Sequence, residues 1–162
     1  MAATYIGRRN VLQHLLLTFG FQPALSYAQG QINALPRSKS LRISAQEASR
    51  QGQPLVLMVT LKGCPWCDFV RNNHLLPLIQ ERGIFVVEID LGNTVLPIQD
   101  FSDLQTTHKA VAQGLNVRRA PTLLFLNGAG AEIAPRLVGV SSQDYYGVYL
   151  EQRIDAARKL VS

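Results

Sequence analysis

Cysteine is scarce in this sequence, whose 162 residues include only Cys64 and Cys67, with two residues between them. This scarcity excludes a network of disulfides that ties distant segments together. Zinc sites usually have four ligands, and neither His74 nor His108 has the spacing to these cysteines that is typical of zinc, so we expect no metal. A reactive dithiol needs only two thiols, and it is the leading hypothesis. A structural disulfide is the alternative, although so short a loop would stabilise the chain little.

Long apolar runs are also missing, because no stretch of about 18 apolar residues occurs, which excludes a conventional transmembrane helix. Acidic residues are slightly outnumbered, at 11 against 16 basic residues, and the formal net charge is +5. This excess is too small to indicate binding to nucleic acid or to a membrane surface. The length and the ordinary share of hydrophobic residues, 47%, indicate a single globular domain.

The N-terminus has the features of an export signal. Arg8-Arg9 precede a short, mildly hydrophobic run, and the small residues Ser26 and Ala28 follow it. The arginine pair resembles a twin-arginine export signal, with the general export route as the alternative. We therefore predict that residues 1–28 are an export signal cleaved after Ala28 and that the protein is periplasmic. The alternative is an amphipathic first helix of the folded domain.

The segment that follows changes from polar to periodic. Residues 29–40 are polar and lack periodicity, which predicts a flexible lead-in. Ser44 and Glu47 have the spacing of a capping box, so a short helix is expected over residues 44–51.

The next elements surround the cysteines. Residues 54–61 are continuously apolar, which is typical of a strand buried on both faces. A helix follows the cysteines, and we expect Pro77 to kink it and Gly83 to end it. A second strand is expected over residues 84–89.

The second half of the chain contains a long connection, a helix, two strands joined by a hairpin turn, and a last helix capped by Ser141-Ser142. In chain order these are residues 91–102, 103–114, 122–127, 132–139 and 143–160. The helix between the first two strands predicts a parallel pair, and the tight turn predicts an antiparallel pair. The expected fold is α/β, with a mixed central sheet and helices on both faces.

The stretch Gly63-Cys64-Pro65-Trp66-Cys67 lies between the first strand and its helix. Proline is well tolerated at the first helical position, and the unpaired amides there carry partial positive charge. A thiolate at Cys64 is therefore stabilised, and we expect its pKa to lie below about 8.5. Lys62 is expected to add to this effect. Cys64 would be the exposed nucleophile, and the more buried Cys67 would resolve the mixed disulfide.

The order of elements, the cysteine motif at a strand-to-helix junction, and the later Arg119-Ala120-Pro121-Thr122 resemble the thioredoxin superfamily over about residues 41–160. The overall pattern is similar to exported, periplasmic bacterial thioredoxin-like thiol–disulfide oxidoreductases. This resemblance implies a thioredoxin-like domain over residues 41–162. It also implies that Pro121 is cis and lies beside the cysteines, and that the peptide groups around Ala120 pair with an extended substrate segment.

The sequence departs from this family at two places near the cysteines. Pro65-Trp66 separate the two cysteines, where thioredoxin itself has Gly-Pro. Met58 occupies the position, six residues before Cys64, where thioredoxin has a buried aspartate. We expect Pro65 and Lys62 to tune the reduction potential, and water or another group to take the proton of the resolving cysteine.

The function expected from this resemblance is thiol–disulfide exchange with protein partners, more specifically reduction, without a cofactor. The partners would be disulfide-bearing or dithiol proteins in the export compartment and an upstream redox donor. The protein is expected to be a monomer that is not inserted in a membrane after signal removal. The alternatives are a redox-inactive peptide-binding module, or a dithiol oxidase or isomerase.

Some aromatic and basic residues remain for assignment. Trp66 is expected either to contact partner proteins or to cover the start of the helix. The tyrosines of the last helix, Tyr145, Tyr146 and Tyr149, are expected to be packing residues. Arg118-Arg119 flank the proline loop and would favour acidic partners, with a solvated pair as the default interpretation.

Overall fold

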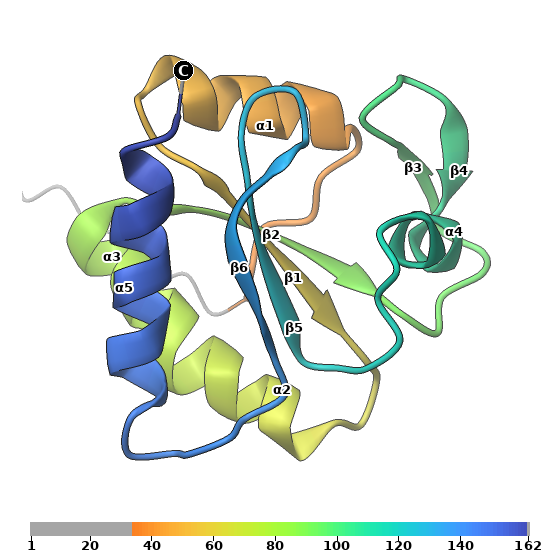
Figure 1. The fold of residues 1–162 in the computed structure, drawn as a ribbon. Helices are drawn as coiled ribbons and strands as arrows, with labels where there is room; N and C mark the ends of the chain where they lie inside the picture. The colour runs from red at the N-terminus through yellow and green to blue at the C-terminus, as the bar shows by residue number, and fades with distance from the viewer. Residues whose placement is uncertain (1–33, 162) are drawn as a thin grey trace, which may run out of the picture. The chain divides into compact units, whose positions relative to one another are not determined.

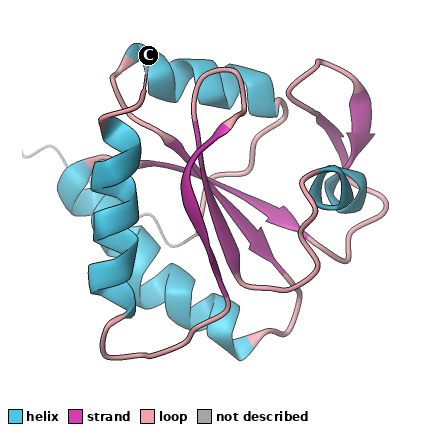
Figure 2. Cartoon of the chain, in the orientation of Figure 1, coloured by secondary structure: helices cyan, strands magenta, loops and turns pink. Residues whose placement is uncertain are grey.

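The computed structural model describes residues 34–161, so the predicted export signal and the first part of the lead-in lie outside the described residues. A four-stranded mixed sheet forms the centre, in the order β2-β1-β5-β6, and β3 and β4 form a separate two-stranded sheet (Figures 1 and 2). The helices are α1 (Leu41–Arg50), α2 (Pro65–Val70), the π-helical turn η1 (Arg71–Leu75), α3 (Leu76–Arg82), α4 (His108–Gly114) and α5 (Tyr146–Arg158). The strands are β1 (Leu55–Thr60), β2 (Phe85–Asp90), β3 (Pro97–Gln99), β4 (Gln105–Thr107), β5 (Thr122–Leu126) and β6 (Glu132–Val138).

The sheet has the predicted strand directions. β1 runs parallel to β2 and antiparallel to β5, and β5 runs antiparallel to β6. Every residue of β1 is buried, as its continuously apolar sequence predicts for a strand covered on both faces. The predicted α/β fold with a mixed central sheet is therefore confirmed.

Side chains of β1 alternate between two cores, one on each face of the sheet. Val56 and Met58 point into a core that α2, α3 and α5 cover. Leu55, Leu57 and Val59 point into a second core, which α1 and α4 cover (Figure 1). The helix that carries Cys67 is thus held by packing against the centre of the sheet.

The first helix begins earlier than predicted, because Ser40 caps it instead of Ser44. The Ser40 hydroxyl accepts a hydrogen bond from the Ile43 amide at 3.3 Å, an interaction that typically contributes about 1 kcal/mol. Ser44 lies inside the first turn, where its hydroxyl bonds that of Ser38 at 2.7 Å. The Glu47 carboxylate binds side chains further along the helix, so the predicted capping box does not form.

The described end of the lead-in packs onto the domain, which contradicts the expectation of flexibility for residues 34–40. Leu35 is only 5% exposed within the core that contains Met58. The Glu88 amide at the edge of the sheet donates to the Pro36 carbonyl at 3.1 Å. A hydrophobic anchor and an edge-strand hydrogen bond therefore hold this polar segment.

The long connection after β2 is partly a strand, and the next helix is shorter than predicted. Ile98 pairs with Thr106 in the β3–β4 ladder, so the residues preceding His108 are extended. The Thr107 hydroxyl then caps α4 by accepting from the Ala110 amide at 3.3 Å. Pairing between segments eight residues apart overrides the local helical pattern here.

The helical segment from Pro65 to Arg82 is interrupted where Pro77 predicts it. The π-helical turn ends at Leu75, and Pro77 then lies at the start of α3. Gly83 adopts a left-handed conformation at the end of α3, with φ of 58°, and its amide donates to the Ile79 carbonyl. The helix is therefore interrupted just before Pro77, and its predicted end at Gly83 is confirmed.

The last helix also differs from its prediction. It starts at Tyr146, its N-cap is Tyr145, and no side chain caps it, so Ser141-Ser142 do not have the predicted role. Only Tyr146 is buried, at 2% exposure, whereas Tyr145 and Tyr149 are exposed, so the packing prediction is wrong for these two. The helix presents only one of the three side chains to the sheet.

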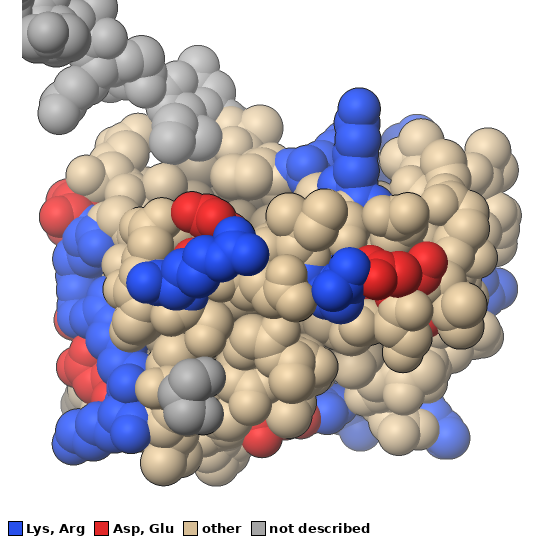
Figure 3. All heavy atoms as spheres, turned by 90° about the horizontal axis from the view of Figure 1, so that it is seen from above, with Lys and Arg blue, Asp and Glu red and all other residues tan. Residues whose placement is uncertain are grey.

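The end of the molecule that carries α1 has charges of both signs. Figure 3 shows this face, at the top of Figure 1, with basic side chains beside acidic ones. Arg42 of α1 pairs with Asp103 at 2.5 Å, and Arg50 pairs with Glu47 at 3.4 Å. Within residues 34–161, no helix is long and apolar enough to cross a membrane.

Candidate active site

Cys64 occupies the N-cap of the helical segment that follows β1. Its Sγ accepts a hydrogen bond from the Cys67 amide at 3.1 Å. Its carbonyl accepts from the amides of Cys67 and Asp68, at 3.0 and 3.2 Å. The sulfur therefore faces the amide groups of the first helical turn, where the partial positive charge stabilises a thiolate.

The two cysteines form a disulfide and differ in burial. Cys64 is partly buried at the surface, whereas Cys67 is 1% exposed inside the core. Pro65 is the first helical residue, as predicted, and Gly63 precedes the motif with φ of 75°, which favours glycine. An incoming partner can reach the outer sulfur, and the inner sulfur lies one turn below it.

The proline loop lies at the same end of the sheet as the cysteines, where β1 ends and β5 begins. The Ala120–Pro121 peptide bond is cis. Thr122 is opposite Val59 in the β1–β5 ladder, so Pro121 lies level with the end of β1, four residues before Cys64. Ala120 and Cys64 both pack against the core that contains Cys67.

Hydrogen bonds on both sides hold the loop and leave its centre available. The Thr122 hydroxyl donates to the Arg119 carbonyl at 2.8 Å, and the Gly139 amide donates to the Pro121 carbonyl at 2.8 Å. Among the described residues, no hydrogen bond involves the N–H or the C=O of Ala120. These two groups are the ones that an extended polypeptide could pair with.

An aromatic row connects the motif with the last helix. Trp66 is 47% exposed and packs edge-on against Phe69, with ring centroids 6.0 Å apart. Phe69 and His74 are 5.1 Å apart, and His74 and Tyr146 are 5.2 Å apart. Burial lowers the pKa of His74 and raises that of Tyr146, so both are uncharged at neutral pH. Trp66 is the exposed end of this row.

The predicted role of Lys62 depends on proximity alone. Its side chain is exposed, two residues before Cys64, and within residues 34–161 it forms no ion pair or hydrogen bond. It therefore adds positive charge at the entrance to the dithiol without holding either sulfur.

The sequence analysis did not identify an ion-pair network beneath the motif. Arg71, four residues after Cys67, pairs with Glu88 of β2 at 2.6 Å and with Asp68 at 2.5 Å, and it donates to the Thr60 hydroxyl at 3.2 Å. Burial lowers the pKa of Arg71, but hydrogen bonds and charge from Glu88, then Asp68, outweigh it and raise the pKa. Glu88 is the one carboxylate in the apolar segment 84–89, and this is the signal in the sequence that could have indicated a buried ion pair.

Glu88 is also the carboxylate beside Met58. The two residues are partners in the β1–β2 ladder, so their side chains point to the same face of the sheet. The Met58 side chain is completely buried, whereas that of Glu88 is 14% exposed and bound by Arg71. A paired carboxylate on the neighbouring strand thus lies next to the methionine. Among the described residues, no cluster of three or more histidine, cysteine or acidic side chains could hold a metal ion.

Comparison with known families agrees with this geometry. The family described as thioredoxin-like domain matches residues 41–154, which contain both cysteines and the proline loop. The chain belongs to the thioredoxin-like family. No curated protein sequence matches it.

Solved structures similar to this thioredoxin-like chain share its fold at low sequence identity. A thioredoxin-fold protein from Helicobacter pylori is 14% identical, with a TM-score of 0.52, over 81% of this chain and 83% of its own. Mitochondrial thioredoxin 3 from Saccharomyces cerevisiae, in its oxidised form, is 19% identical, with a TM-score of 0.50, over 75% of this chain and 93% of its own. DsbH oxidoreductase is 19% identical, with a TM-score of 0.49, over 78% of this chain and 87% of its own. The chain has a thioredoxin-like fold, with its CxxC motif at a strand-to-helix junction.

Proposed function

We propose that this thioredoxin-like protein is an exported thiol–disulfide oxidoreductase that reduces disulfides in partner proteins. The observation that carries the proposal is the placement of the two sulfurs. Cys64 Sγ accepts the Cys67 amide at the helix N-terminus, and Cys67 is buried directly beneath it. An outer sulfur stabilised as a thiolate and an inner sulfur one turn away are the two groups that dithiol exchange requires.

The reaction needs no group beyond the two thiols and the partner. The Cys64 thiolate attacks one sulfur of the partner's disulfide, and the other partner sulfur leaves as a thiolate and takes up a proton. Cys67, as its thiolate, then attacks the Cys64 sulfur of the mixed disulfide and releases the second partner thiolate, which is also protonated. The partner gains two electrons and two protons, and the Cys64–Cys67 disulfide carries the oxidation until an upstream dithiol donor reduces it.

The surface around the dithiol supports a polypeptide substrate. The free N–H and C=O of Ala120 favour pairing with an extended segment beside the partner's cysteine, next to Pro121. The exposed side chain of Trp66, which lies between the two cysteines in the chain, provides apolar contact area. We propose that the protein acts as a monomer on disulfide-bearing proteins.

Export is proposed from residues 1–28, whose arginine pair, apolar run and small residues are typical of a cleaved signal. The protein recovered from the periplasm should begin at Gln29. Changing Arg8-Arg9 to Lys-Lys should leave the precursor uncleaved if the twin-arginine route is used. Recovery of an intact N-terminus from an active, cytoplasmic protein would contradict the export proposal.

A trapping experiment tests the exchange reaction. Cys67→Ala should accumulate mixed disulfides between Cys64 and partner proteins, visible on non-reducing gels and removed by dithiothreitol, because the resolving sulfur is missing. The matched Cys64→Ser variant should form none. If Cys67→Ala forms no adducts and Cys64→Ser still binds partner proteins without a covalent bond, the protein is a redox-inactive binding module.

The reduction potential of the Cys64–Cys67 pair decides the direction of electron flow. A potential at the reducing end of the range, towards the thioredoxin value of about −270 mV, supports the reductase role. A value near the strongly oxidising end, about −120 mV, would instead indicate that the protein is a dithiol oxidase. The measurement uses equilibration with glutathione buffers followed by alkylation of free thiols.

A further inference from the structure

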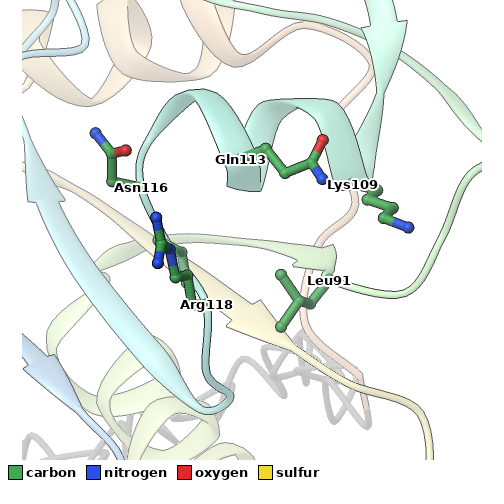
Figure 4. Close-up of a pocket in the computed structure, with 6 residues that line it drawn as sticks. Leu91, Lys109, Gln113, Asn116 and Arg118 are labelled. Carbon is green, nitrogen blue, oxygen red and sulfur yellow. The ribbon is translucent and has the colours of Figure 1, made fainter.

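A cavity of about 450 Å³ lies beside the proline loop, between the end of β2 and helix α4. It is lined by Leu91, Lys109, Gln113, Asn116, Val117 and Arg118. Figure 4 shows Arg118 and Lys109 on opposite sides, with Leu91 and Gln113 between them. The lining therefore combines two cations and two amide side chains around an apolar contact.

Backbone hydrogen bonds shape this pocket in advance. Asn116 has a left-handed conformation, with φ of 56°, and its amide donates to the Gln113 carbonyl at 2.9 Å. The Val117 amide donates to the Ala112 carbonyl at 2.8 Å, and the Lys109 amide donates to the Asn93 carbonyl at 2.9 Å. Two carbonyls at the end of α4 are thus bonded within the chain, which reduces the negative potential they present to the pocket.

The cations of the pocket lack acidic partners in the described part of the chain. Neither Lys109 nor Arg118 forms an ion pair, and the same holds for Arg119 and Lys62 next to the dithiol. Asp90 precedes Leu91, and its Oδ1 accepts the Gly92 amide at 2.8 Å, but among the described residues it forms no ion pair with either cation, and it is one acidic residue against two basic ones. This contrasts with the ion pairs elsewhere, and it leaves an excess of positive charge around the pocket.

The pocket and the dithiol lie at the same end of the sheet, beyond the last residues of β1 and β2. The Leu91 amide donates to the Thr60 carbonyl at 2.8 Å, and the Leu61 side chain packs onto Gly92. On the other side, Arg118 lies two residues before Ala120, so their Cα atoms are at most about 7 Å apart. A polypeptide that pairs with Ala120 while its cysteine reaches Cys64 can place a neighbouring side chain in the pocket.

We propose that this pocket binds a carboxylate side chain on the segment that flanks the partner's reactive cysteine, so that the protein prefers acidic disulfide substrates. The inference rests on the proposed exchange function and names the substrate chemistry of that site. Lys109 and Arg118 provide the charge, and the side-chain amide of Gln113, which lies between them in Figure 4, provides hydrogen-bond donors. A polypeptide fits better than nucleic acid, because the charges number few and the adjacent free groups are those of backbone pairing.

Two synthetic peptides test the inference. Each contains one disulfide, and they differ only in whether two residues flanking the attacked cysteine are Glu or Gln. The second-order rate constant for oxidation of the reduced protein is measured by acid quench and mass spectrometry. At low salt the Glu peptide should react about fivefold faster, and the advantage should vanish near 1 M salt, where the screening length is about 3 Å.

Variants then locate the preference. Lys109→Gln/Arg118→Gln should bring the ratio of the two rate constants to about one, and Lys109→Glu/Arg118→Glu should invert it, because two like charges then repel the Glu peptide. The control Lys39→Gln/Lys159→Gln removes the same charge from exposed lysines outside the pocket and should keep the ratio. Circular dichroism and thermal unfolding confirm that the variants are folded.

Each remaining outcome overturns the inference in a distinguishable way. Equal rates for the two peptides at low salt would show that exchange occurs without the acidic preference, so the proposed function would stand alone. A preference that survives in Lys109→Gln/Arg118→Gln would belong to another surface. Failure of both peptides to react would refute the proposed function and this inference together.

Discussion

Arg71 and Glu88 form an ion pair of 2.6 Å directly behind the dithiol helix, although 17 residues separate them in the chain. The side chains are only 18% and 14% exposed, so water screens the pair weakly. A second nitrogen of Arg71 strengthens the contact, because Nε donates to the same Glu88 oxygen at 2.9 Å. The pair therefore fastens the helix that carries Cys67 to the edge strand β2.

Removing one member of this pair should destabilise the protein strongly. Arg71→Met should lower the free energy of unfolding by about 3 kcal/mol, because it leaves the poorly solvated Glu88 carboxylate without its partner. Glu88→Gln should lower it by less, because Arg71 keeps its ion pair with the exposed Asp68. The double variant Arg71→Met/Glu88→Gln should lose clearly less than the sum. Urea denaturation of the four proteins gives this double-mutant cycle, and strict additivity would show that the pair contributes no coupling.

The control for this cycle is a surface pair. Arg82→Met should lower the free energy of unfolding by less than about 1 kcal/mol, because its partners Glu151 and Asp155 are more than half exposed. An equal loss for Arg82→Met and Arg71→Met would mean that burial does not determine the effect.

Trp66 should contribute to the recognition of protein partners. Its ring is 47% exposed between the two cysteines, and truncation of such an aromatic contact typically costs more than about 1 kcal/mol. Trp66→Ala should therefore slow exchange with a protein disulfide by about fivefold or more, and slow reaction with dithiothreitol less. Leu160→Ala, which removes an exposed apolar side chain at the end of the chain, is the control. Equal slowing with both reagents would assign Trp66 to the helix start and not to partner binding.

Gly130 should be intolerant of any side chain. It lies in the β5–β6 turn with φ of 80°, and an added Cβ would overlap the ring of Phe101. Gly130→Ala should lower the free energy of unfolding by about 2 to 4 kcal/mol, from backbone strain and overlap together. Gly83 also has a positive φ, of 58°, but a Cβ there meets no atom within 4 Å, so Gly83→Ala should lose only about 1 kcal/mol. Thermal and urea unfolding would refute the role of Phe101 if the two losses were equal.

His108 should make stability depend on pH. Burial lowers its pKa, Arg37 lowers it further, and Asp90 and Glu88 oppose the shift. Its Nδ1 accepts the Asp90 amide at 3.2 Å, a bond that protonation would break. Because the unfolded chain then binds more protons than the folded one, stability is complete above about pH 6.5 and falls as the pH decreases.

The unfolding midpoint should accordingly decrease between pH 7.5 and 5.5. His108→Asn keeps an acceptor for the Asp90 amide without the titrating group, so this variant should show a smaller decrease. The pKa of His74 is also lowered by burial and contributes in the same direction, so His74→Gln/His108→Asn should show the smallest decrease. An unchanged pH dependence in the double variant would rule out both histidines as its source.

The sequence predicted the parts of this protein that depend on short-range patterns. The apolar run before Cys64, proline at the first helical position and Gly83 at a helix end are local signals, and each appears where it was expected. Helix starts were less predictable, since Ser40 and Ser44 have equal capping chemistry, and in the structure Ser40 caps a helix whose first residue, Leu41, is buried. In the same way, the exposure of Tyr145 beside the buried Tyr146 follows from how the helix meets the sheet.

By itself, therefore, the sequence determined the thioredoxin-like architecture and the position of the two cysteines, because a buried strand, a tight turn and a helix start are encoded within a few residues of each other. Only the tertiary structure decided that Glu88 lies beside Met58 and pairs with Arg71, and that Lys109 and Arg118 line one pocket near Ala120. Such groups come from separate elements. Their juxtaposition depends on strand register and helix packing, which single-sequence periodicity does not contain.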